Sequence, residues 1–218
     1  MSVSVITPPT AKRLTTVSHV RGDLGLAADA LADAQLQRWI DQASQQAATY
    51  CRRAFGRETV RERFDLACSG VVGECGGILL DRSPIVSIGS VKAGGMLLAP
   101  DAYATDGRML YRLDSDERRW WSGRRIVVQY EAGWILPGEP QTVEGVATTA
   151  EDLPADIERA VIQLVGVAIS ASGRDLMVKS EDVEGIGSTS WYVQGANAAL
   201  PHPEAEATLS QYRRLLFA

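Results

Sequence analysis

The residues in this chain best suited to chemistry are its three cysteines and two histidines, because these types bind zinc and serve as nucleophile and base in catalysis. They are Cys51, Cys68, Cys75, His19 and His202. Zinc sites use paired short spacings such as Cys-x2-Cys, which these residues do not show. Three cysteines also leave one unpaired in any intramolecular disulfide scheme, which favours a reduced, cytosolic history. We expect no metal site, and we interpret Cys51 as a small buried hydrophobic residue.

A second group that could do chemistry is the set of acidic and hydroxyl side chains between residues 181 and 190. Glu181, Asp182 and Glu184 are possible metal or catalytic carboxylates, but no histidine or second carboxylate pair stands beside them at ligand spacing. Ser188 does not lie in a Gly-x-Ser-x-Gly elbow, and the chain has no Gly-x4-Gly-Lys phosphate loop. We therefore expect a solvated loop, with no catalytic, cofactor-binding or metal-binding residue. An enzyme such as a small hydrolase would lack its nucleophile, base and metal.

The segment Arg118-Arg-Trp-Trp-Ser-Gly-Arg-Arg125 is the one cluster that is both basic and aromatic. Such a cluster can stack on bases or hold phosphates. It is more typical of a hairpin whose tryptophans pack on a sheet while its arginines stay solvated, and the acidic residues around it would largely cancel its charge. A third interpretation is a contact between subunits. The candidates for that contact are Arg118, Arg119, Trp120 and Trp121.

Composition sets the limits for the elements that must position these residues. The chain has 218 residues, with 45% hydrophobic and 22% charged residues, which suits a soluble protein of one domain or one domain with an insertion. Its net charge of −5 disfavours a surface devoted to nucleic acid. The first ten residues do not resemble a signal peptide, and no apolar run approaches the roughly 20 residues that span a bilayer. We expect a cytoplasmic product that does not enter a membrane.

Four stretches have the periodicity or capping pattern of helices. The longest, Ala34–Phe55, carries an apolar stripe at steps of three and four, with Asp33 as its N-cap and Gly56 as its end. A helix over Pro154–Ala171 is apolar on nearly all sides, which is typical of a central or covered helix. Shorter helices are predicted over Ala11–Arg21 and Glu204–Phe217. The stripe on the longest helix consists of Leu36, Ile40, Ala43, Ala47, Tyr50 and Ala54.

Between residues 60 and 134 the pattern changes to strands. Alternation or β-branched runs mark Arg61–Leu66 and Ile85–Val91, and Gly94-Gly95 marks a tight turn. Met109–Leu113 and Ile126–Tyr130 are predicted to pair as a hairpin. We expect five or six short strands in a small sheet or sandwich. The stretches Pro137–Ala150 and Gly173–Pro203 lack any period and are predicted to be loops.

Five segments, in this order, resemble the head–tail connector (adaptor) proteins of tailed bacteriophages and gene transfer agents. The family implies an α+β fold, in which N-terminal residues 1–56 and C-terminal residues 137–218 form a helical bundle and residues 57–136 form an inserted antiparallel β domain. The segments that carry the resemblance are Tyr50-Cys-Arg-Arg-Ala-Phe55, Leu80-Asp-Arg-Ser-Pro-Ile-Val-Ser-Ile88, Ile126-Val-Val-Gln-Tyr-Glu-Ala-Gly-Trp134, Leu153-Pro-Ala-Asp-Ile-Glu-Arg-Ala-Val-Ile162 and the loop from Arg174 to Gly185.

The resemblance implies a structural virion protein, not an enzyme, without a cofactor. Such a protein forms a homo-oligomeric, twelve-fold ring beneath the portal, binds the next neck or tail protein, and lets duplex DNA pass without sequence-specific binding. It also implies that the C-terminal segment binds the portal, although the same residues would serve equally to complete the subunit's own helical core. Alternatives are another neck ring protein (a stopper or tail terminator) and a DNA-binding packaging protein. The portal-contact candidates are Tyr212, Arg213, Arg214, Leu216 and Phe217.

Overall fold

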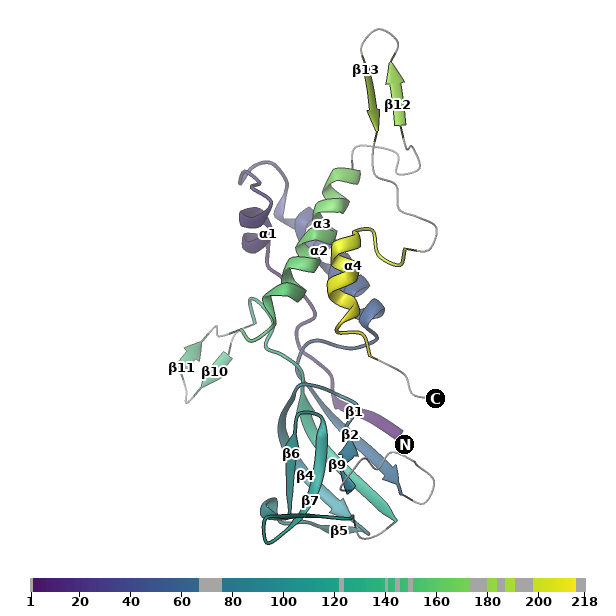
Figure 1. The fold of residues 1–218 in the computed structure, drawn as a ribbon. Helices are drawn as coiled ribbons and strands as arrows, with labels where there is room; N and C mark the ends of the chain where they lie inside the picture. Colours follow the sequence, from purple (N-terminus) through teal and green to yellow (C-terminus); the bar gives the residue numbers. More distant parts are fainter. Residues whose placement is uncertain are drawn as a thin grey trace. The chain divides into compact units, whose positions relative to one another are not determined.

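The computed structural model describes residues 2–66, 76–121, 124–139, 141–143, 146–148, 151–172, 180–183, 187–190 and 198–214. The fold is α+β and divides into two compact units (Figure 1). The β unit contains Met1–Thr10 and Gly56–Ile135, and the helical unit contains Ala11–Phe55 and Leu136–Ala218. Residues 2–10, expected in the N-terminal helical part, belong to the β unit because the first strand pairs with the second.

The β unit is built on a five-stranded antiparallel sheet with the strand order β1-β2-β9-β4-β5. A second group of strands has the order β3-β7-β6, with β8 also paired to β7. The strands of the first sheet are β1 (Ser2–Thr7), β2 (Glu58–Asp65), β9 (Arg125–Ala132), β4 (Ile85–Ala93) and β5 (Met96–Leu97). Those of the second are β3 (Ile78–Leu79), β6 (Tyr103–Asp106), β7 (Met109–Asp114) and β8 (Glu117–Arg119).

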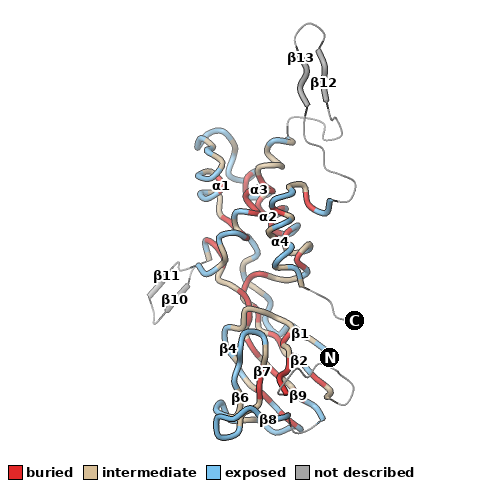
Figure 2. The backbone as a smooth tube through the Cα atoms, in the orientation of Figure 1, coloured by how far each residue is buried: buried red, intermediate tan, exposed pale blue. Residues whose placement is uncertain are grey.

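The core of the β unit follows from the alternation of side chains along its strands. In β2 every second residue is buried, and β9 shows the same alternation (Figure 2). The inward-facing apolar side chains of both sheets meet in a single cluster, as in other two-layer β folds. Its members are Val60, Phe64, Ile78, Leu80, Val91, Ala93, Leu110, Trp121, Ile126, Val128, Tyr130 and Ala132.

The predicted hairpin between Met109–Leu113 and Ile126–Tyr130 is wrong. These stretches are β7 and β9, and they lie in different sheets: β9 pairs with β2 and β4, whereas β7 pairs with β3, β6 and β8. A tight turn at Ser115 and Asp116, both with positive φ (52° and 66°), sends β7 into β8 instead. Alternation identifies a strand, but the partner is chosen by the tertiary packing.

The described residues of the helical unit form four helices: α1 (Val17–Asp23), α2 (Asp33–Cys51), α3 (Ala155–Ala171) and α4 (Pro203–Ser210). α2, α3 and α4 pack against one another, and α1 packs against α2 and α3. The predicted stripe is the buried face of α2, with Tyr50 half-buried and Ala54 beyond the end of the helix. No helix in the described part of the chain is long and apolar enough to cross a membrane.

The helix boundaries differ from the predicted ones where capping decides them. α2 stops at Cys51 because Arg52 takes the left-handed conformation (φ 55°, ψ 38°) and closes the C-cap, so the helix does not reach Gly56. α1 begins at Val17, after the N-cap Thr16, whose hydroxyl accepts a hydrogen bond from the backbone N–H of His19. α4 ends at Ser210, well before Phe217, which lies outside the described residues.

Two stretches predicted to be loops contain short antiparallel strand pairs. β10 (Gln141–Val143) pairs with β11 (Val146–Thr148), and β12 (Ser180–Val183) pairs with β13 (Gly187–Ser190). Two short strands close together in the sequence can pair through backbone hydrogen bonds alone, so their sequences need not show an apolar pattern. The carboxylate candidates Glu181 and Asp182 lie in β12 and Ser188 in β13, whereas Glu184 lies outside the described residues.

Candidate functional site

The turn between β3 and β4, within the family-like segment from Leu80 to Ile88, is held by a buried polar network. The Tyr130 hydroxyl donates to Glu62 Oε1 at 2.6 Å, and the backbone N–H of Asp81 donates to the same oxygen at 2.9 Å. The backbone N–H of Arg82 donates to the Tyr130 hydroxyl at 2.9 Å. The Arg82 guanidinium then pairs with Glu58 at 2.6 Å and with Asp81 at 2.8 Å. Two of the five family-like segments are thus bonded directly to each other.

Burial sets the charge state of this network. Glu62 is fully buried, and the loss of water raises the pKa of its carboxyl to about 7. Desolvation also raises the pKa of Tyr130, so its hydroxyl remains a donor at all physiological pH values. Glu62 Oε2 has no hydrogen-bond partner among the described residues. Since the other polar atoms face one another inside the core, the network holds the turn in place rather than presenting groups to a substrate.

The family-like Gly133-Trp134 pair is also explained by folding. Gly133 has φ +116°, and a Cβ atom there would lie 2.5 Å from the carbonyl oxygen of Gly56. Its N–H donates to the Pro84 carbonyl at 3.0 Å, and Trp134 forms a β-bridge with Gly56. Only glycine fits where the chain leaves β9, so this position serves the fold.

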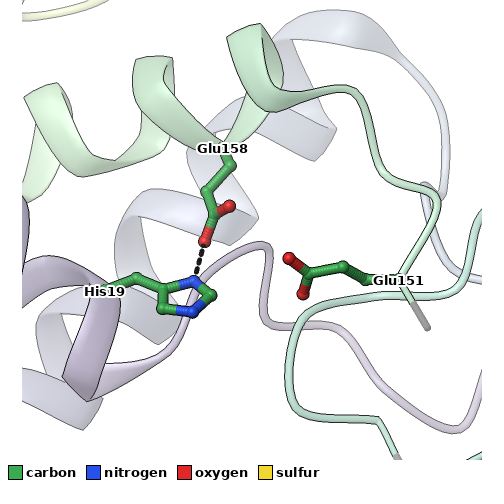
Figure 3. A group of neighbouring side chains, drawn as sticks. All are labelled: His19, Glu151 and Glu158. Atoms are coloured by element: carbon green, nitrogen blue, oxygen red, sulfur yellow. Dashed lines mark hydrogen bonds and ion pairs between the residues drawn. The ribbon is translucent and has the colours of Figure 1, made fainter. Parts of the chain in front are cut away.

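His19, Glu151 and Glu158 come together in the helical unit (Figure 3). Their ligand-type atoms all lie within 4.8 Å of one another. His19 Nδ1 is 2.7 Å from Glu158 Oε1, and the hydroxyl of the buried Thr15 donates to that same oxygen at 2.8 Å. The hydrogen bond to Glu158 raises the pKa of His19. The sequence does not reveal this group, because His19 and Glu158 lie 139 residues apart.

One histidine and two carboxylates are residue types that bind divalent cations. Here, however, Glu158 Oε1 already takes part in two hydrogen bonds, and both His19 and Glu151 are largely exposed. The bonds from Thr15 and His19 connect the start of α1 to the first turns of α3. These bonds therefore hold the two helices together, and we call the group of Thr15, His19 and Glu158 the clamp between α1 and α3.

The predicted portal-contact residues divide into two groups. Tyr212, Arg213 and Arg214 contact the subunit's own helices, whereas Leu216 and Phe217 lie outside the described residues. The Tyr212 hydroxyl donates to the Asp156 carboxylate at 2.7 Å, and burial together with this hydrogen bond raises the pKa of Tyr212 to about 12. The Arg213 guanidinium lies 5.4 Å from the centre of the Tyr50 ring. The backbone N–H of Arg214 donates to the Cys51 carbonyl at 2.9 Å.

Cys51 is fully buried, as interpreted from the sequence. Its thiol donates to the Leu209 carbonyl at 3.4 Å and so connects the end of α2 to α4. Desolvation raises its pKa to about 11, so the thiolate that a nucleophile or metal ligand requires is scarce at neutral pH. Cys51 is a packing residue.

The subunit-contact candidates also take different positions. Trp121 is buried in the core of the β unit, whereas Trp120 is 68% exposed. The Arg118 guanidinium lies 3.8 Å from the centre of the Tyr111 ring and 3.3 Å from the Asp106 carboxylate. Arg119 pairs with Asp114. Both arginines thus have carboxylate partners, which weakens the field that would attract phosphate.

No family model and no curated protein matches the sequence. Among solved structures, the fold is similar to that of a chain in the neck of an empty gene transfer agent particle determined with C6 symmetry (16% identity, TM-score 0.53). A neck chain of the native particle determined with C12 symmetry matches at 15% identity and TM-score 0.52. A chain of the native virion matches at 14% identity and TM-score 0.52. Each match covers 100% of this chain and 98% of the other.

The chain has the fold of gene transfer agent neck proteins. The resemblance inferred from five short segments is therefore confirmed at the level of the fold. Because the match runs from end to end, the β unit is an integral part of this fold, as are the helices on either side of it in the sequence.

Proposed function

We propose that the protein is a structural subunit of the neck of a tailed phage or gene transfer agent particle, and specifically its head–tail adaptor. In this proposal it is made in the bacterial cytoplasm, forms a ring beneath the portal, and joins the capsid to the next neck or tail protein. Duplex DNA passes through the ring without sequence-specific binding. The observation that carries the proposal is the end-to-end likeness to neck chains of gene transfer agent particles, whose neck structures were determined with C6 and C12 symmetry.

The side chains support a structural role rather than an enzymatic one. Among the described residues, two of the types that do chemistry make contacts that stabilise the fold: the Cys51 thiol donates to the Leu209 carbonyl, and the His202 ring accepts from the Ala205 N–H as the N-cap of α4. Glu158 Oε1 is hydrogen-bonded to Thr15 and to His19.

Electron microscopy of the purified protein, alone and mixed with the portal of the same particle, tests the proposal. We expect weak self-association alone and closed rings on the portal, because head-to-tail contacts close only when the rotation between subunits is right. Failure to bind the portal, combined with binding to a downstream neck or tail protein, would favour a stopper or tail terminator. Steeply salt-dependent binding to duplex DNA without the portal would favour a packaging protein.

The portal contact is proposed for the C-terminal residues, with Leu216 and Phe217 as the docking side chains. Tyr212 and Arg214 bond to Asp156 and Cys51 of the same subunit. The double variant Leu216→Asp/Phe217→Asp should lose portal binding and melt within a few degrees of the parent. A large drop in melting temperature, or unchanged portal affinity, would mean that these side chains complete the subunit's own core.

A further inference from the structure

The large hydrophobic side chains that are exposed in the described part of the chain are not scattered. They are Val5, Ile6, Val86, Met96, Leu97 and Trp120. Five of the six belong to strands at the two sides of one sheet, whose order is β1-β2-β9-β4-β5. Val5 and Ile6 lie on β1, and the other three lie on β4 and β5. We call these the β1 edge (Ser2–Thr7) and the β4 edge (Ile85–Ser90 with Met96 and Leu97).

Both edges carry backbone groups that the described sheet leaves unpaired. β1 pairs only with β2. β5 pairs with β4 only at Lys92 and Ala93, so Ile85–Ser90 have β9 on one side and no strand of the described sheet on the other. Free edges of this kind pair readily with another chain unless charges or prolines guard them. Neither Ser2–Thr7 (Ser-Val-Ser-Val-Ile-Thr) nor Ile85–Ser90 (Ile-Val-Ser-Ile-Gly-Ser) contains a charge or a proline.

The strand directions make the two edges complementary. Every neighbouring pair in the order β1-β2-β9-β4 is antiparallel, so β1 runs opposite to β4. A β1 strand from a second copy, added beside β4, therefore continues the antiparallel alternation. Each segment has six residues, or about 20 Å of strand. The register shifts near Val5 and within β4 bend both strands and restrict which residues can face each other.

We propose that the β1 edge of one subunit pairs with the β4 edge of the next subunit, so that the five-stranded sheets join head to tail around the ring. The partner is a second copy of this chain, because the same molecule carries both halves of the contact, on opposite sides of a single sheet. Two unlike surfaces of this kind form a heterologous interface, which generates a closed ring or an open filament rather than a dimer. Met96 and Leu97 cover the incoming strand at its end. The inference rests on the proposed ring function.

Disulfide cross-linking of the assembled ring tests the pairing. Ser4 of β1 and Ser90 of β4 lie on the face of the sheet that points away from the core. The strand pairing shows this, because Ser4 lies opposite Arg61, Arg61 opposite Gln129, and Gln129 opposite Ser90. In a Cys68→Ser/Cys75→Ser background, Ser4→Cys and Ser90→Cys single variants are mixed, assembled on the portal and oxidised. A second mixture uses Ser87→Cys in place of Ser90→Cys. Ser87 is paired with Glu131 and Ser90 with Gln129, so the two mixtures sample two possible registers between the β1 and β4 edges.

We expect dimers between the two unlike variants in at least one mixture, and a ladder up to the full ring when one chain carries both cysteines. Each single variant alone should give no dimers. Val127→Cys, on the same face but on the central strand β9, is the matched control and should not cross-link to Ser4→Cys. Rings that form normally but give no cross-link in either mixture overturn the pairing and leave the adaptor proposal standing. If the parent protein forms no ring, both proposals fail.

A charge placed on the edge gives a second, independent measurement. Val86 is 39% exposed, so Val86→Lys should leave the melting temperature of the subunit within a few degrees while lowering ring formation on the portal at least tenfold. Thr105→Lys puts the same charge on the exposed edge strand β6 of the other sheet and should assemble normally. Equal assembly of both variants would contradict the proposed interface.

Discussion

The Tyr130 hydroxyl donates a 2.6 Å hydrogen bond to the carboxylate of Glu62 inside the β unit, and the two residues lie 68 positions apart in the sequence. The same hydroxyl accepts from the backbone N–H of Arg82. One phenol thus connects β2, β9 and the turn between β3 and β4. This contact joins the Ile126–Trp134 segment directly to the Leu80–Ile88 segment, two of the five segments that resemble connector proteins.

Replacing Tyr130 by Phe should destabilise the protein by about 1–3 kcal/mol, because Glu62 loses a donor and the Arg82 N–H loses its acceptor, both in buried surroundings. Urea unfolding at pH 7 measures the change. Tyr103→Phe is the matched control, since Tyr103 is half-buried and its hydroxyl makes no hydrogen bond to the described residues. Equal effects of the two substitutions would mean that the network contributes nothing beyond packing.

Glu62→Gln should make stability less dependent on pH. Burial raises the pKa of Glu62 from 4.5 to about 7, so the folded state favours the protonated carboxyl. The stability contributed by the protonated form is complete below about pH 4.5 and is lost as the pH rises through about 7. The variant keeps an oxygen at the position of Oε1 and cannot ionise. The free energy of unfolding of the variant, taken relative to that of the parent, should therefore increase by about 2–3 kcal/mol from pH 5 to pH 8.

Denaturant titrations of both proteins at several pH values measure this difference. A parallel pH dependence in the parent and in Glu62→Gln would show that Glu62 is not the titrating group. The aspartate variant is not a suitable control, because its shorter side chain withdraws the oxygen from Tyr130 and leaves a cavity.

Gly133→Ala should destabilise the β unit by more than about 2 kcal/mol. The added Cβ meets the Gly56 carbonyl oxygen at 2.5 Å, and the residue must also adopt φ +116°. Gly107→Ala is the matched control, because Gly107 has φ +57° but a Cβ added there would meet no atom of the described residues within 4 Å. Gly107→Ala should lower the free energy of unfolding by about 1 kcal/mol. Thermal unfolding of the two variants separates steric conflict from backbone strain, and equal costs would contradict the close approach.

Removing the Glu158 carboxylate should lower the pKa of His19. The hydrogen bond to Glu158 is the largest cause of the raised value, and Glu158→Gln replaces it with a neutral partner. Titration of the His19 ring protons by NMR measures the change directly. Because a raised histidine pKa contributes stability below its ordinary value of about 6.5 and loses it as pH rises through the raised value, Glu158→Gln should destabilise more at pH 5.5 than at pH 8.5.

Thr15→Val is the control for this clamp. It removes the other bond to Glu158 Oε1 but leaves His19 in place, so its cost should depend little on pH. A His19 pKa that does not move in Glu158→Gln would refute the clamp between α1 and α3.

Local chemistry made several features of this protein predictable. The apolar spacing of Leu36, Ile40 and Ala47 determines the buried face of α2 wherever the helix packs, and alternation in Arg61–Leu66 and Ile126–Tyr130 determines which side chains enter a core. Gly94-Gly95 makes the turn between β4 and β5, with positive φ at both residues. These properties depend on neighbours within a few residues, so they can be deduced from sequence.

Pairing over long separations could not be deduced in this way. β1 is a strand only because β2 accepts it, and β7 and β9 lie in different sheets although their patterns suit a hairpin. His19 meets Glu158, and Tyr130 meets Glu62, because the fold brings distant segments together. The sequence alone determined the helices, the strands with clear alternation and the apolar faces of both. The tertiary structure decided which elements pair and which edges stay open, because that choice depends on the packing and backbone hydrogen bonding of the whole chain.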